Sequence, residues 1–126
     1  MPIKYNVSEK GNPLKPQEPK KFYANAKNTG DTTLRTLSKE IAARSTVSPA
    51  DIYAVLVALT EVTTEHLANG KIVRLGDFGA FQVSVGSNGA ETAAKFNASM
   101  IKTKKVTFRP GIDLKEMLNN LKFEKA

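Results

Sequence analysis

The stretch NGKIVRLGDFGAF, residues 69–81, marks a change in the pattern of the chain. An apolar helical run ends at Asn69 and Gly70, and a glycine there can adopt the left-handed conformation that closes a helix. The segments KIVRL and FGAFQVSV follow, separated by a GD pair suited to a turn. In the second segment apolar Phe81, Val83 and Val85 alternate with polar residues, which is typical of a sheet with one covered face. The stretch therefore predicts a helix followed by two strands.

Upstream of this stretch the apolar residues recur at helical spacing. Leu34, Leu37 and Ile41 predict a helix that starts near Thr33 and ends near Arg44. The letters SPAD then place Ser48 as the cap and Pro49 in the first turn of a second helix, which runs to residue 69.

The second helix is unusual because residues 52–59, IYAVLVAL, are apolar on every side. A surface helix packed on one neighbour needs only one apolar stripe. A chain of 126 residues offers few elements to surround such a helix, so we expect a second copy of the chain to cover it. The sequence thus predicts a homodimer.

The two ends of the chain differ from this middle part. Residues 1–30 contain four of the six prolines, and their segments IKYNV and KFYANA alternate as edge strands do. Downstream, residues 92–102 favour a helical turn or two, residues 104–109 alternate as a strand, and residues 110–123 predict a short closing helix. We therefore expect an N-terminal extension over residues 1–30 and one domain over residues 31–126.

Composition narrows the classes of function. The net charge is +7, divided as +3 over residues 1–31, −1 over residues 32–70 and +5 over residues 71–126, which favours a polyanionic partner for the C-terminal half. The chain has no cysteine and a single histidine, His66, which excludes disulfides and multi-histidine metal sites within one chain. No secretion signal or membrane span is predicted. We expect a cytoplasmic protein that is not an enzyme and has no cofactor, no metal, no membrane association and no small-molecule substrate.

The order of elements, together with NGKIVRLGDFGAF and FRPGIDLKEML, resembles the bacterial histone-like family of HU and integration host factor over about residues 33–120. The likeness is to an HU-like branch with an N-terminal extension. It implies an α+β fold in which two chains intertwine, with two N-terminal helices, a three-stranded antiparallel sheet with a modified arm and a short C-terminal helix. It also implies that Phe78 and Phe81 are core residues and that Gly79 lies where the chain packs closely.

By the same resemblance the protein would bind double-stranded DNA non-specifically, as an architectural protein of the nucleoid whose arms enter the minor groove. Arg109, before PG, matches a position where the family approaches phosphate. The arm-tip motif of Arg, Asn and Pro is absent from residues 83–105, and Ile112 stands where the family often has Lys. Binding through phosphates is therefore expected without a proline wedge.

The candidate DNA contacts are basic residues around the predicted strands, which could follow phosphates with strongly salt-dependent affinity. The set is Arg74, Lys102, Lys104, Lys105 and Arg109, then Lys95 and Lys115, with Lys71 nearby. In a regular strand Lys104 and Lys105 point to opposite faces, so they should not serve one surface equally. The other hypothesis is a dimeric protein-interaction or structural module that has lost DNA bending, which the extra N-terminal strands favour.

Overall fold

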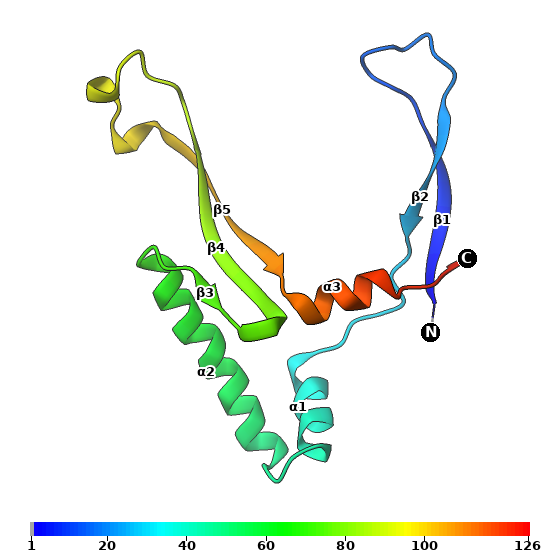
Figure 1. The fold of residues 1–126 in the computed structure, drawn as a ribbon, viewed down its shortest axis with the longest axis vertical. Coiled ribbons are helices and arrows are strands. Elements are labelled where there is room, and N and C mark those ends of the chain that lie inside the picture. The colour runs from blue at the N-terminus through cyan, green and yellow to red at the C-terminus, as the bar shows by residue number, and fades with distance from the viewer. Residues whose placement is uncertain (1) are drawn as a thin grey trace. The chain divides into compact units, whose positions relative to one another are not determined.

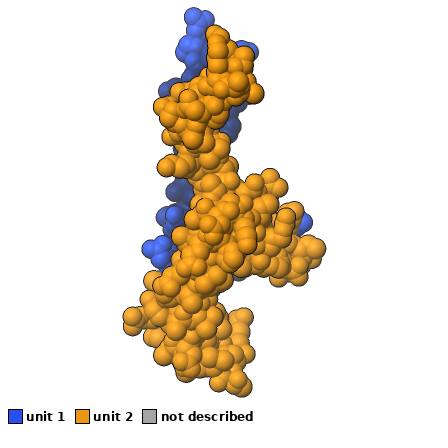
Figure 2. Space-filling model, turned by 90° about the vertical axis from the view of Figure 1, so that its left-hand side faces the viewer, with its two compact units in different colours: residues 1–32, 117–126 blue, residues 33–116 orange. Residues whose placement is uncertain are grey.

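The computed structural model describes residues 2–126. The chain divides into two compact units: unit 1 contains residues 1–32 and 117–126, and unit 2 contains residues 33–116 (Figure 2). The segment predicted as an N-terminal extension therefore shares its unit with the C-terminal residues. The described residues form three α-helices and six strands in two sheets (Figure 1).

The HU-like arrangement expected from the sequence is wrong. Two strands precede the first helix, so the helices are not the N-terminal elements of the fold. The closing helix is followed by a sixth strand, and the strands form two three-stranded sheets where one was expected. The physical reason is a pairing between the two ends of the chain, because the last strand adds in parallel to the first.

The two helices that begin unit 2 start and end as the sequence predicts. Helix α1 spans Leu34–Ala43, and the Thr33 side chain accepts a hydrogen bond from the Thr36 amide at 3.3 Å. Helix α2 spans Pro49–Ala68, and its cap Ser48 accepts from the Asp51 amide at 3.2 Å. These side-chain oxygens satisfy amides that have no partner inside the helix. Gly70, at φ 82°, then redirects the chain.

The sheet of unit 2 contains β3 (Val73–Arg74), β4 (Gly79–Ser87) and β5 (Ile101–Pro110) in the order β3-β4-β5, all antiparallel. A 3-10 turn at Gly76–Phe78 separates β3 from β4. Between β4 and β5 the chain makes two more 3-10 turns, Ala93–Lys95 and Ala98–Met100, where the sequence predicts helical turns. Helix α3 spans Ile112–Asn119.

Unit 1 is a small mixed sheet with the strand order β2-β1-β6. Strand β1 spans Ile3–Lys10 and pairs antiparallel with β2, Lys21–Ala26, and parallel with β6, Phe123–Lys125. The predicted strands near both ends of the N-terminal segment are thus confirmed. Strand β6 was not predicted, because the sequence pattern extends the closing helix to residue 123.

Very little apolar surface is buried inside the single chain. Ile52 is the one apolar residue counted as buried among the described residues, and Ser38 is the one buried polar residue. The accessible surface is 10730 Å², whereas a folded monomer of this mass exposes about 6,600 Å². The helix predicted to be surrounded is therefore not surrounded by its own chain.

Helix α2 shows this deficit most clearly. Val55, Leu59 and Val62 are 64%, 42% and 49% exposed, and their spacing of four and three residues places them on one face of the helix. An apolar stripe of this kind is stable in water only when something covers it.

Candidate nucleic-acid interface

The register of the β3-β4-β5 sheet divides its side chains between two faces. Arg74 lies opposite Ala80, which lies opposite Arg109, so the two arginines are in one row on one face. Two strand spacings separate their backbones, about 10 Å. The same face continues along the hairpin with paired polar residues: Gln82 opposite Thr107, Ser84 opposite Lys105 and Gly86 opposite Thr103. We call this set, from Arg74 to Thr103, the polar face of unit 2.

A hollow of about 180 Å³ lies at the arginine end of the polar face. It is lined by the two arginines together with Gly76, Gly79, Ala80, Pro110 and Gly111, with no acidic residue among them. The guanidinium group is planar, is always charged and matches phosphate oxygens in two-point hydrogen bonds. The hollow therefore has the dimensions and charge to accept a phosphate group.

Glycines shape the backbone around this hollow. Gly79 has φ 151°, and a Cβ added there would lie 2.5 Å from the Arg109 carbonyl oxygen and against the Phe108 ring. A side chain on Gly111 would overlap the carbonyl of Asp77. The Gly111 amide donates to the Phe78 carbonyl at 2.8 Å, so the turn before β4 is tied to the end of β5. Only residues without a side chain permit this close approach, which holds the two arginine-bearing strand ends together.

The opposite face of the sheet is apolar. Phe81 lies opposite Phe108 with ring centroids 4.8 Å apart, and Phe78 approaches Phe108 edge-on at 5.7 Å. Val83 opposite Val106 continues the face. Phe108 contacts both of the other rings, and Phe81 is half-buried. Phe78 is 52% exposed, so the core role expected for it is not met within the single chain.

The structure brings together only some of the predicted basic residues. Arg74, Lys105 and Arg109 share the polar face, whereas Lys104 lies opposite Val85 on the apolar face. The predicted separation of Lys104 from Lys105 is therefore confirmed. Lys102 has no partner in the register, because the pairing shifts between Thr103 and Ile101.

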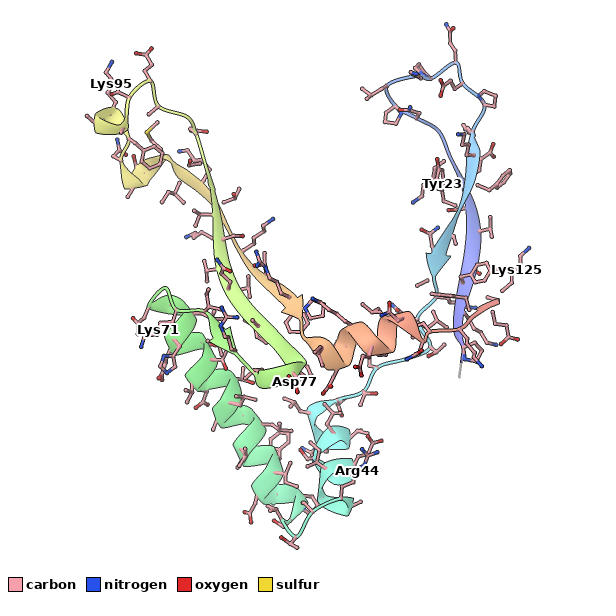
Figure 3. All side chains as sticks on the ribbon, viewed as in Figure 1. Tyr23, Arg44, Lys71, Asp77, Lys95 and Lys125 are labelled. Carbon is pink, nitrogen blue, oxygen red and sulfur yellow. The ribbon has the colours of Figure 1, made fainter. Side chains whose placement is uncertain are left out.

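The remaining predicted residues lie elsewhere. Lys95 is at the far end of the β4-β5 hairpin (Figure 3), where its ammonium group is 3.2 Å from the Glu91 carboxylate. Lys115 is on α3, and Lys71 follows the end of α2. Apart from Lys95, none of the predicted basic residues makes an ion pair within the described part of the chain.

Sequence reasoning missed the polar residues between the cations. The Thr107 hydroxyl donates to the backbone carbonyl of Gln82 at 3.2 Å, so this bond does not use the Gln82 side chain. The Ser84 hydroxyl oxygen is buried without a hydrogen-bond partner beside Lys105. The signal was present in the sequence, since these residues alternate with the valines, but their grouping with the arginines needed the strand register.

The described residues contain no helix that combines the length and the apolarity needed to cross a membrane. They also contain no group of three or more histidine, aspartate or glutamate side chains placed to hold a metal ion.

The fold and the polar face define a chain that carries an antiparallel sheet with one basic, hydrogen-bonding surface. A family model described as "HU domain fused to wHTH, Ig, or Glycine-rich motif" matches residues 1–125, and the chain belongs to this HU-HIG family. A search of curated protein sequences gives no match.

One similar solved structure comes from Bacteroides vulgatus and is described provisionally as a bacterial DNA-binding protein. It aligns with a TM-score of 0.66 at 15% identity over 98% of this chain, so the two share a fold. The chain spans 47% of the length of that protein.

Proposed function

We propose that this protein binds double-stranded DNA without sequence preference, as an architectural protein of the bacterial nucleoid, and that it has no catalytic role. The observation that carries the proposal is the polar face, where two arginines flank a phosphate-sized hollow and Lys105 extends the charge along β5. Membership of the HU-HIG family and the description of the Bacteroides vulgatus protein support a DNA partner.

The chemistry of the polar face favours contacts to phosphates over contacts to base edges. Arginine and lysine bind phosphate oxygens of any sequence, and the Gln82 side chain between them can hydrogen-bond to the same backbone. Such contacts fix a protein on the duplex without reading sequence. Each neutralised phosphate releases counterions, so affinity falls steeply as salt rises.

The test is fluorescence anisotropy with a labelled random 30-base-pair duplex at several salt concentrations between 50 and 300 mM. We expect saturable binding, and the logarithm of the association constant should fall linearly with the logarithm of the salt concentration. A second duplex of unrelated sequence should bind with equal affinity. Absence of binding at 50 mM salt would contradict the proposal. A strong preference for one sequence would contradict its non-specific part.

We also propose that the binding form is a homodimer. The support is the excess of accessible surface and the apolar stripe of Val55, Leu59 and Val62, which no described part of the chain covers. A second copy is always present at the same concentration and can cover the same stripe by two-fold symmetry.

The homodimer is tested by light scattering after size exclusion at micromolar concentration. The measured molar mass of the wild type should be twice the chain mass of 13.7 kDa. Val55→Asp should shift the protein towards monomer, because the introduced carboxylate would be buried without a partner in the dimer. Thr64→Asp is the matched control, because it adds the same charge on the opposite side of α2. A wild-type monomer would overturn the homodimer.

A second candidate function is a protein-interaction or structural module. The observation that favours it is the extra sheet of unit 1, whose apolar residues Phe22 and Phe123 are 69% and 62% exposed. A gel shift on random duplex at two salt concentrations separates the two functions. Salt-sensitive retardation supports DNA binding, and no retardation at low salt supports the module.

A further inference from the structure

The sheet of unit 1 also has two faces of opposite character. Ile3, Tyr5 and Val7 alternate along β1, and the register aligns them with Ala24 and Ala26 of β2 and with Phe123 of β6. This face is mainly apolar, with Glu9 opposite Phe22 at one end and Lys125 opposite Tyr5 towards the other. The other face carries only polar side chains and one tyrosine: Lys4, Asn6, Ser8 and Lys10 from β1, Lys21, Tyr23 and Asn25 from β2, and Glu124 from β6. An apolar face is driven out of water, so the polar face is the one left open to a charged ligand.

The lysines on this polar face are concentrated at its outer end. Lys10 lies directly opposite Lys21 in the β1-β2 register, which places their Cβ atoms about 5 Å apart. Like charges in this position destabilise a sheet unless an anion lies between them. Neither lysine makes an ion pair within the described residues.

The neighbourhood of this lysine pair suits a phosphate. A hollow of about 70 Å³ lies beside it, lined by Lys10, Asn12, Glu18, Pro19, Lys21 and Tyr23. The single acid in the lining, Glu18, is 3.5 Å from the ammonium group of Lys15, so its charge is already partly compensated. The Asn12 side-chain oxygen accepts from the Leu14 amide at 2.9 Å, which leaves its amide group free to donate.

Charge at the other end of the face is more balanced. Lys4 lies opposite Glu124 of β6, so this part of the face offers little net attraction to an anion. Between the two ends, the Asn25 amide donates to the Ser8 hydroxyl at 2.7 Å and fixes a polar patch along the strands. Unit 1 as a whole has eight lysines and four acids, a net charge of +4, although it is the smaller unit.

We propose that the polar face of unit 1 is a second DNA-contact surface, in which Lys10 and Lys21 together bind the phosphodiester backbone and Tyr23 and Asn12 hydrogen-bond beside them (Tyr23 on β2 is labelled in Figure 3). This inference rests on the proposed DNA-binding function and adds a site outside unit 2. Its physical basis is that a phosphate relieves the repulsion between two cations that otherwise have no partner.

The test compares Lys10→Gln/Lys21→Gln with wild type in the anisotropy assay. If both contacts are lost, affinity at 0.1 M salt falls by up to about 60-fold. The salt slope, which is the steepness with which the logarithm of the association constant falls against the logarithm of salt concentration, decreases by about 1.8. The matched control, Lys122→Gln/Lys125→Gln, removes the same charge around β6, at the other end of the sheet. It should weaken binding less than threefold. Lys10→Arg/Lys21→Arg keeps the charge and should retain binding.

Folding is checked by thermal unfolding without DNA. Because Lys10→Gln/Lys21→Gln removes a repulsive pair, it should not lower the melting temperature, so weaker binding can be assigned to lost contacts. Equal loss in the Lys10/Lys21 variant and in the Lys122/Lys125 control would overturn the site, since it would show only a general effect of charge. If wild type does not bind DNA at 50 mM salt, the proposed function fails together with this site. If wild type binds and the Lys10/Lys21 variant binds equally well, the site alone fails.

Discussion

Replacing both arginines of the unit 2 hollow tests the proposed interface most directly. Arg74→Gln/Arg109→Gln removes two cations that lie in one row about two strands apart. Each phosphate contact contributes a salt slope of about 0.9, so loss of two contacts lowers the slope by about 1.8 and weakens affinity about 60-fold at 0.1 M salt. Glutamine keeps hydrogen-bonding capacity, so the change is chiefly one of charge.

The assay is the salt titration of duplex binding, with Lys39→Gln/Arg44→Gln as the control that removes two positive charges from the region of α1. Arg44 lies beyond the C-terminal end of that helix, away from the labelled Lys71 and Lys95 positions in Figure 3. The control should lower affinity only a few-fold, through the general field of the protein. If the arginine variant lost no more affinity than this control, the hollow would not be the phosphate site.

Two further predictions concern the geometry of the same sheet. Lys105→Gln should weaken duplex binding about eightfold at 0.1 M salt. Lys104→Gln should have a smaller effect, because Lys104 lies on the apolar face. If anisotropy showed the larger loss for Lys104→Gln, the two faces would be wrongly assigned. Gly79→Ala should lower the free energy of unfolding, measured by chemical denaturation, by at least about 1 kcal/mol. The reason is that the alanine Cβ would meet the Arg109 carbonyl and the Phe108 ring. An unchanged denaturation midpoint would show that the turn is less tightly packed than described.

The local structure of this chain could be predicted well from the sequence. Ser48 before Pro49 specified the start of α2, and Gly70 specified its end. Alternation from Phe81 to Val85 predicted a strand with one apolar face, and the register confirms it. These features depend on neighbouring residues, since capping, helical spacing and alternation act over one or two turns of chain.

The candidate site was predicted in part. Arg74, Lys105 and Arg109 were selected for charge, and they do share a face. Lys95 was selected in the same way, yet it is paired with Glu91 at the far end of the hairpin. Charge alone therefore identified basic residues without showing which of them act together.

The sequence by itself determined where the helices and every strand except β6 form, that the chain is basic and that α2 is too apolar for one small chain to cover. The tertiary structure alone decided that β6 forms and joins β1, and that Lys10 lies against Lys21 while Arg74 aligns with Arg109. The physical reason is the range of the interactions. Helix caps and side-chain alternation are set by adjacent residues, whereas strand pairing joins residues far apart in the chain, and a shift of one residue in register would move every side chain to the other face.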